Sequence, residues 1–157
     1  MKNLFFYHTD IGRIGIAENG TEITDLCFEG AAVPRDASVC ETELLKRTAE
    51  ELREYLAGER KEFTVPLSPK GTEFQRRVWE SLCAIPYGVT RSYREIADSV
   101  GCPKGFRAVG MANNRNPIPI MIPCHRVIGA DGSLTGYGGG LEIKVRLLEL
   151  EKRVLRG

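Results

Sequence analysis

Apolar and polar residues alternate near the start of the chain, over residues 3–8, 12–17 and 22–28. This period of two predicts three short β-strands. Thr9-Asp10 and Asn19-Gly20 separate the strands, and Asn-Gly is a favoured hairpin turn because both residues tolerate positive φ. The pattern therefore predicts an antiparallel three-stranded sheet.

A helical period replaces this alternation from about Thr42 to Ala57, and Gly58 follows as a stop signal. The next punctuation is Leu67-Ser68-Pro69-Lys70-Gly71, which has the composition of a linker. We therefore place the domain boundary there. The prediction is an N-terminal α/β domain over residues 1–66 and a second domain over residues 67–157.

The second domain is predicted to be mostly helical. Thr72 with Gln75, and Ser92 with Glu95, have the spacing of capping boxes, in which two side chains satisfy each other's backbone amides at a helix start. The helix from Ser92 is expected to end near Val100.

After the turn Gly101-Cys102-Pro103, a third helix is expected to run to about Asn113. Helix, short turn and helix fit either a helix-turn-helix that binds DNA or a plain helical hairpin, and the pattern alone does not decide. A last helix is expected from Glu142 to about Arg153. Its predicted inward positions are Leu141, Val145, Leu148 and the neighbouring apolar residues.

Charge is distributed unevenly along the chain, although the net charge is only +1. Residues 1–65 carry 8 Lys/Arg against 13 Asp/Glu, a net of −5, whereas residues 66–157 carry 14 against 8, a net of +6. A basic C-terminal part suits a polyanion such as DNA, and a dipolar surface without function has the same charges.

Five cysteines without a CxxC pair do not suggest a disulfide framework or a zinc site. We expect four of them, Cys27, Cys40, Cys83 and Cys102, to be small buried hydrophobic residues. The longest apolar run is too short to span a bilayer, and the first residues do not have a signal-peptide pattern. The chain is therefore expected to stay in the cytoplasm, away from membranes.

Candidate chemistry lies in the segment from Asn116 to Ile128, whose three prolines exclude a helix and favour an extended path. Within it, Cys124 and His125 invite interpretation as a nucleophilic thiol and its base. Neighbours in an extended chain point to opposite sides, so a direct hydrogen bond would need a bend or a bridging water. On adjacency alone, a buried cysteine beside a surface histidine is the better interpretation.

Residues 71–151 resemble the O6-alkylguanine-DNA alkyltransferases, and residues 1–65 resemble their N-terminal domain loosely. The matching stretches are Gly71–Gln75, Val78-Trp79, Ile85–Gly88, Ser92-Tyr93, Arg107–Gly110, Asn116-Pro117, Ile122–Ile128, Gly136–Leu141 and Lys144. The Pro-Cys-His-Arg-Val core is highly specific. The resemblance implies an α+β fold, with a ribonuclease-H-like N-terminal domain and a winged-helix-like helix-turn-helix domain.

The resemblance implies that Cys124 accepts an alkyl group, that His125 takes its proton through a water, and that Glu151 orients the histidine. It further implies that the Tyr93 hydroxyl serves the departing O6 atom and that Asn116 ties the recognition helix to the active-site segment. Without the resemblance, Glu151 is one more helix charge. Tyr93 is then a helix-cap residue and Asn116 an Asx turn before proline.

The same resemblance implies that Arg107 fills the space left by a nucleotide flipped out of the duplex. Alone, Arg107 suits a phosphate contact or a solvated charge. The residues implied to contact DNA are Ser92, Tyr93, Arg107, Ala108, Gly110 and Met111. Those implied to line the alkyl pocket are Pro119, Val127, Tyr137 and Gly138. Phe106 stands where the family usually has a small residue, so either a wedge into the groove or inward packing fits.

The implied function is DNA repair by a single, stoichiometric alkyl transfer from double-stranded DNA to a monomeric protein, without metal or cofactor. The preferred alkyl size and activity on O4-alkylthymine stay open. Three alternatives remain. A protein that only binds alkylated DNA has tryptophan in place of the acceptor, which Cys124 argues against. A thiol hydrolase would turn over, and a transcription regulator would select one operator sequence.

Overall fold

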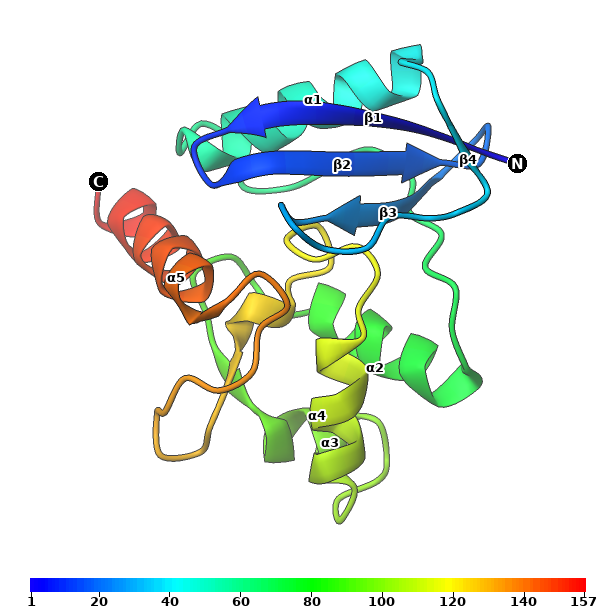
Figure 1. Ribbon diagram of the computed structural model, residues 1–157. Helices are drawn as coiled ribbons and strands as arrows, with labels where there is room; N and C mark the ends of the chain where they lie inside the picture. Colours follow the sequence, from blue (N-terminus) through cyan, green and yellow to red (C-terminus); the bar gives the residue numbers. More distant parts are fainter. The chain divides into compact units, whose positions relative to one another are not determined.

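The computed structural model describes every residue of the chain and divides it into two compact units, Met1–Lys70 and Gly71–Gly157. Figure 1 shows the helices and strands of both units. The linker expected to separate the domains stays with the first unit. The Ser68 amide donates a hydrogen bond to the Ile23 carbonyl at 2.8 Å, and Leu67 forms a bridge with the same strand.

The first unit is a four-stranded sheet with one helix. Its elements are β1 (Lys2–Thr9), β2 (Gly12–Glu18), β3 (Ile23–Cys27), β4 (Ala37–Val39) and α1 (Glu43–Leu56). The sheet order is β3-β2-β1-β4. The three expected antiparallel strands are present, and β4 adds a fourth strand that pairs parallel to β1. The three-stranded sheet predicted from the alternation was therefore one strand short.

Helix α1 begins where the sequence predicts, because the Thr42 hydroxyl accepts a hydrogen bond from the Leu45 amide. Its apolar side contacts β1 and β2. Leu45, Leu52 and Tyr55 on that side are fully buried. Burial of this stripe against the sheet forms the core of the first unit.

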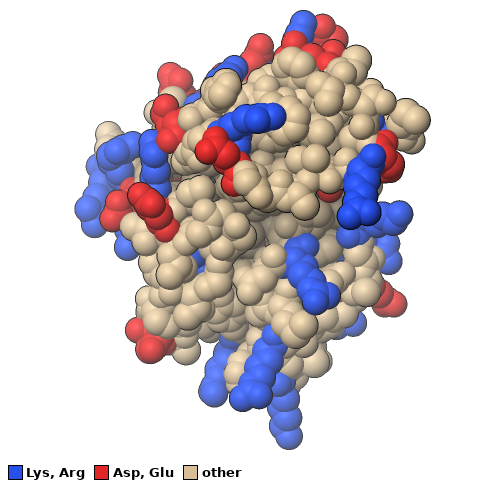
Figure 2. All heavy atoms as spheres, viewed as in Figure 1, with Lys and Arg blue, Asp and Glu red and all other residues tan.

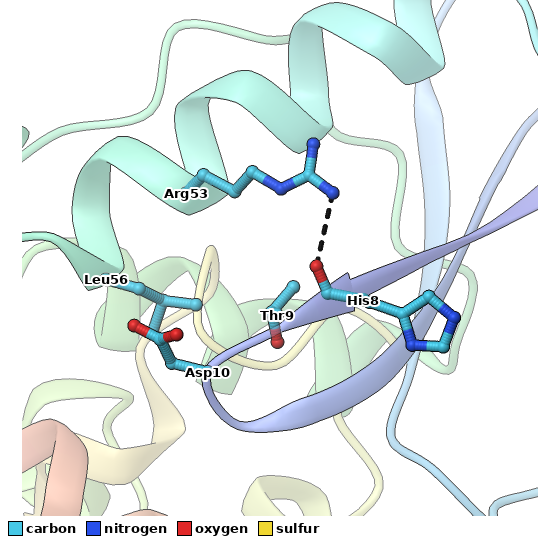
Figure 3. Close-up of a pocket in the computed structure, with 5 residues that line it drawn as sticks. All are labelled: His8, Thr9, Asp10, Arg53 and Leu56. Carbon is cyan, nitrogen blue, oxygen red and sulfur yellow. Dashed lines mark hydrogen bonds between the residues drawn. The ribbon is translucent and has the colours of Figure 1, made fainter.

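A small polar hollow lies where β1 ends beside α1 (Figure 3). Its lining residues are His8, Thr9, Asp10, Arg53 and Leu56. The Arg53 guanidinium donates to the His8 carbonyl at 3.1 Å, so this contact fastens the helix to the end of the strand.

The second unit is mostly helical. Its elements are α2 (Glu73–Cys83), β5 (Arg91–Ser92), α3 (Tyr93–Ser99), α4 (Phe106–Asn114), the 3₁₀ turn η1 (Cys124–Arg126), β6 (Val127–Ile128) and α5 (Leu141–Arg156). Both predicted capping boxes form, at the starts of α2 and α3. None of the helices has the length and apolarity needed to cross a membrane.

The core of the second unit is built around α2. Val78, Trp79 and Leu82 are buried along its inner face. The Trp79 indole donates to the Ala112 carbonyl at 2.9 Å, which fixes α2 against α4. Helices α3 and α4 pack on each other and on α2, so the predicted helix-turn-helix is confirmed as a packed unit.

Two short strands bring the start of α3 beside the cysteine segment. Strand β5 pairs parallel to β6, with Arg91 opposite Val127 and Ser92 opposite Ile128. Tyr93, the next residue after β5, is thereby placed near the end of the segment that carries Cys124.

The buried face of α5 differs from the prediction. Leu141 and Val145 are exposed, at 48% and 36%, whereas Lys144, Leu147 and Glu151 are buried. The neighbouring apolar residues Leu147 and Leu150 are buried as expected, but Leu141 and Val145 are not. Lys144 and Glu151 are buried in addition, because these charged residues find partners in the interior that offset their desolvation. The cysteine prediction was also wrong. Cys27 and Cys102 are half-buried, and Cys40 and Cys83 are exposed.

Candidate functional site

The segment that carries Cys124 is folded into consecutive turns, so the predicted extended path was wrong. The Ile122 amide donates to the Ile118 carbonyl at 3.0 Å, and Cys124–Arg126 form a 3₁₀ turn. Between them, Ile120 has a φ of 75°. Prolines exclude a helix, but they do not prevent tight turns between them.

Asn116 holds this segment in place. Its side chain donates to the Ile122 carbonyl at 2.8 Å and accepts from the Ile118 amide at 2.9 Å. Asn116 lies one residue beyond the C-cap of α4, Arg115, so it joins the second helix of the helix-turn-helix to the cysteine segment.

The Cys124 side chain is 3% exposed. Burial raises the pKa of its thiol to about 11, against opposing effects from hydrogen bonds with the Asn116 side chain and two backbone amides and from the charge of Lys144. The two amides belong to Cys124 and Ile120. The resting sulfur is therefore a thiol, surrounded by groups that stabilise a thiolate once it forms.

Beside the cysteine, a buried cluster joins η1 to α5. The His125 Nε2 atom lies 2.8 Å from a Glu151 carboxylate oxygen. Arg126 donates to the same carboxylate through Nε and Nη2, both at 2.9 Å. The Gly88 amide adds a fourth hydrogen bond at 3.0 Å, and a further Arg126 donor reaches the Ile85 carbonyl at 2.8 Å.

This cluster sets the state of the imidazole. Burial lowers the pKa of His125, and the neighbouring Glu151 carboxylate only partly opposes the effect. In the neutral ring, Nε2 donates to the carboxylate, so Nδ1 carries the lone pair that can accept a proton. His125 and Glu151 thus form a base and its orienting carboxylate.

Lys144 links the end of the cysteine segment to the loop before α5. Its ammonium group donates to the Val127 carbonyl at 2.7 Å and to the Thr135 carbonyl at 2.9 Å. The Tyr93 hydroxyl donates to the same Thr135 carbonyl at 3.2 Å. Tyr93 is therefore anchored to the loop that contains Tyr137 and Gly138.

Lys144, Arg126 and Asn113 are part of the site, although the sequence assigned them no role. The buried Asn113 side chain donates to the Cys124 carbonyl at 3.4 Å, and its side-chain oxygen is buried without a hydrogen-bond partner. Arg126 and Lys144 lay within the matched motifs, and Lys144 precedes Glu151 by two helical turns. The seven-residue spacing between Lys144 and Glu151 could have indicated from the sequence that these two residues lie on one face of the last helix.

The remaining pocket candidates occupy two environments. Pro119 and Val127 are buried in the segment on either side of Cys124, while Tyr137 is half-buried and Gly138 exposed in the following loop. Tyr137 follows Gly136, which has a positive φ of 52°. No three His, Cys, Asp or Glu side chains lie together in a way that would hold a metal ion.

The DNA-contact candidates lie on α3 and α4. Arg107, Ala108 and Met111 are exposed on α4, Gly110 is half-buried there against the Tyr93 ring, and Ser92 caps α3. Figure 2 shows Lys and Arg side chains gathered over this end of the second unit. The exposed basic residues of α3, α4 and their connecting turn are Arg94, Lys104 and Arg107, and the exposed Arg115 caps the end of α4.

Phe106 is 37% exposed, and its ring centroid lies 5.5 Å from the guanidinium carbon of Arg94. The sequence allowed either inward packing or a wedge directed at the DNA groove, and Phe106 is only partly packed inward. The ring is held against α3 and keeps one side open, beside Arg107.

A buried cysteine and a histidine–carboxylate pair thus lie in one unit with a helix-turn-helix. Residues 73–153 match the DNA-binding domain of 6-O-methylguanine DNA methyltransferase, and residues 5–69 match its ribonuclease-like domain. The chain belongs to the 6-O-methylguanine DNA methyltransferase family.

Individual proteins agree with this assignment. The methylated-DNA–protein-cysteine methyltransferase of Mycobacterium bovis is 51% identical over 144 residues, which cover 90% of this chain and 87% of that protein. The corresponding protein of Methanosarcina barkeri is 58% identical over 111 residues, covering 71% and 70%. The crystal structure of Mycobacterium tuberculosis OGT in complex with DNA has a TM-score of 0.92 at 46% identity, covering 97% of this chain and 94% of that one. The expected α+β fold class and the family resemblance are thus confirmed.

Proposed function

We propose that this protein repairs DNA by moving an alkyl group from the O6 atom of guanine to the sulfur of Cys124, once per molecule. The observation that carries the proposal is the buried Cys124 thiol next to a buried His125, whose Nε2 atom lies 2.8 Å from the Glu151 carboxylate. The names of the relatives, methylated-DNA–protein-cysteine methyltransferase, support the same reaction.

The chemical step is an in-line displacement at a saturated carbon. The Cys124 sulfur forms a bond to the alkyl carbon while the bond between that carbon and O6 breaks, and its electron pair stays with guanine. The thiol loses one proton and guanine gains one, so the balance requires no metal, cofactor or oxidant. The product is a thioether, which water does not cleave under mild conditions, so each molecule acts once.

Proton removal must accompany the transfer. With a pKa of about 11, only about one thiol in ten thousand is ionised at pH 7. His125 Nδ1 accepts the proton through a bridging water, and Glu151 stabilises the imidazolium that forms. Asn116 and the surrounding amides stabilise the sulfur as its negative charge develops.

The remaining residues act on the substrate. The Tyr93 hydroxyl, now donating to Thr135, turns to guanine O6 and supports the leaving group. Pro119, Val127, Tyr137 and Gly138 enclose the alkyl group. Because the reacting carbon lies inside a stacked duplex, the nucleotide is rotated outward.

The DNA contacts follow from the same proposal. Ser92, Ala108, Gly110 and Met111 contact the DNA, and Arg107 fills the space that the flipped nucleotide leaves. The protein acts as a monomer on double-stranded DNA that contains O6-alkylguanine. Its free cysteines suit the reducing cytoplasm, where we place it.

Mass spectrometry after incubation with O6-methylguanine DNA tests the proposal. We expect one added methyl group per molecule, on Cys124, with or without a chelator. Cys124→Ser is expected to abolish transfer and to keep DNA affinity, because serine is a weak nucleophile of similar size. Methylation at Cys40 or Cys83, or several methyl groups removed per molecule, would contradict it. The second outcome would favour a thiol hydrolase.

A further inference from the structure

The carboxylate of Glu151 serves two partners at once, the histidine beside the cysteine and an arginine. Its Oε1 atom accepts from Arg126 Nε at 2.9 Å and from the Gly88 amide at 3.0 Å. Its Oε2 atom accepts from Arg126 Nη2 at 2.9 Å and lies 2.8 Å from His125 Nε2. An ionised carboxylate offers about four lone-pair positions, two on each oxygen. The histidine ring therefore holds one of these positions, and the arginine holds two.

Arg126 is itself held in a fixed place. Its Nη1 atom donates to the Ile85 carbonyl at 2.8 Å, and its guanidinium carbon lies 5.5 Å from the centroid of the Tyr87 ring. The side chain is buried. A guanidinium group does not lose its proton in proteins, so this positive charge is permanent. The turn after α2 thus fixes a constant cation against the carboxylate that orients the histidine.

The charges around His125 disfavour a protonated ring. The imidazole is fully buried, and the neighbouring Glu151 and Arg126 already form a neutral, doubly hydrogen-bonded pair. Lys144 on α5 is a further buried cation, and α2, the other helix packed on η1, ends at the neutral thiol of Cys83. An imidazolium would therefore add an uncompensated positive charge where water cannot hydrate it.

Without the arginine, the same imidazole would face a carboxylate that has no other charged partner. A buried carboxylate at hydrogen-bonding distance favours the charged form of a histidine, because opposite charges attract strongly where the dielectric constant is low. A ring that is protonated at rest has no lone pair left to receive a proton. The arginine therefore decides between two states of one histidine, a neutral base and a cation.

We propose that Arg126 is a positioning residue that keeps His125 neutral and able to accept a proton, by sharing the carboxylate of Glu151. The inference rests on the proposed function, in which the proton of the Cys124 thiol passes through a water to His125 Nδ1. The S–H bond breaks, an N–H bond forms, and the electron pair stays on sulfur for its bond to the alkyl carbon. The carboxylate beside Nε2 then stabilises the transient imidazolium.

NMR titration of the histidine rings tests the inference, because the chain has only two histidines and His8→Gln assigns their signals. In the parent protein we expect the His125 ring to be neutral at pH 7, with its hydrogen on Nε2. In Arg126→Met we expect its pKa to lie at least about one pH unit higher than in the parent, and above ~6.5, the ordinary value for histidine. One pH unit corresponds to a tenfold gain in the proton affinity of the ring.

The position of this pKa separates the proposed role from a merely structural one. A loosened site would admit water and bring the pKa of His125 toward its ordinary value, whereas a lone buried carboxylate raises the pKa beyond that value. Arg126→Lys keeps the positive charge, so its His125 should keep a pKa below the ordinary value. The exposed His8 should titrate alike in every protein.

Three results would overturn the inference. The first is a protonated His125 in the parent protein at pH 7. The second is a His125 pKa at or below ~6.5 in Arg126→Met. The third is an equal rise of this pKa in Arg126→Lys and Arg126→Met.

A second replacement keeps the inference testable if Arg126→Met does not fold. Citrulline in place of Arg126 has nearly the shape of arginine and keeps the N–H at Nε, but it has no charge. It is introduced in the full-length protein by ligating a synthetic segment that begins at Cys102 to residues 1–101. We expect the same rise in the pKa of His125, and an unchanged pKa would overturn the inference.

Single-turnover transfer from O6-methylguanine DNA is then measured against pH on the same proteins. The rate should fall as the pH drops through the pKa of His125, so this acid limb should lie at least about one pH unit higher in Arg126→Met than in the parent. An acid limb at the same pH would count against the inference and overturn it. If the parent protein transfers nothing, the proposed function fails, and the NMR titration still decides the role of Arg126.

Discussion

The buried carboxylate of Glu151 offers a quantitative test of the site. Glu151→Gln removes the negative charge that faces Arg126 and changes one acceptor oxygen into an NH2 group. The carboxylate accepts four hydrogen bonds, from His125, from two Arg126 nitrogens and from Gly88. A glutamine can orient its oxygen toward only some of these donors, so its NH2 group must face the others.

The cost follows from the burial of both partners. Glu151 is 1% exposed and Arg126 is 7% exposed, so neither charge can recover hydration when the other is lost. Breaking a buried ion pair by removing one partner costs about 3–5 kcal/mol. We expect this loss of unfolding free energy for Glu151→Gln, and a similar one for Arg126→Met. In the double variant no charge is left unpaired, so its cost should fall below the sum of the single costs by at least about 2 kcal/mol.

Urea unfolding followed by tryptophan fluorescence measures these costs in the relevant unit, because Trp79 is the single tryptophan of the chain and is buried in the second unit. The reasoning is refuted if each single variant loses less than about 1 kcal/mol, or if the two costs add within about 0.5 kcal/mol. Either result would mean that the ion pair in the structure contributes little in solution.

Three further expectations concern DNA and pH. Arg107→Ala should slow single-turnover repair in duplex DNA about tenfold, which corresponds to about 1.4 kcal/mol, and should leave transfer from the free base unchanged; equal slowing of both would place Arg107 in the chemistry or the fold. DNA affinity should fall steeply with salt and depend weakly on sequence, in a binding titration at several salt concentrations; strong selection of one operator would favour a regulator. The free energy of unfolding should decrease from pH 7 to pH 5. The pKa of His125 is lower in the folded than in the unfolded chain, so the unfolded chain binds a proton in this range and the folded chain does not. If the free energy of unfolding of His125→Gln has the same slope with pH, this assignment is contradicted.

Features set by nearby residues were predictable from the sequence. The capping boxes at Thr72 and Ser92 formed as expected, since each depends on two side chains three residues apart. The hairpin at Asn19-Gly20 is equally local. Its Asn19 side chain accepts the Thr21 and Glu22 amides, and Gly20 has a φ of 107°.

Features that depend on distant partners were not predictable. Strand β4 is only three residues long and pairs with β1 across the first unit, so its own sequence has no useful period. Helix α5 buries Lys144 and Glu151 because their partners come from the cysteine segment and the loop before the helix. The left-handed Ile120 also escaped prediction, because residue type argues against that conformation.

The burial of each cysteine was also not predictable from its neighbours in the sequence, because burial depends on the packing of distant elements. The residues around Cys40 and Cys83 did not predict that these two cysteines are exposed while Cys124 is buried. Only the Pro-Cys-His-Arg-Val motif identified the candidate acceptor. Its partners His125 and Glu151 were identified by the resemblance, and the structure joins them at 2.8 Å.

The burial of Cys124 matters most for a reagent that can be used once. Small electrophiles and oxidants in a cell react with thiolates, and a permanently ionised sulfur would be consumed by them before any lesion was met. The protonated, 3% exposed thiol is poorly reactive toward such compounds, while the exposed Cys40 and Cys83 offer them alternative targets. The resting site therefore has a weakly nucleophilic sulfur, which reacts slowly with other electrophiles. As a result, Cys124 stays unmodified until an alkylated guanine binds.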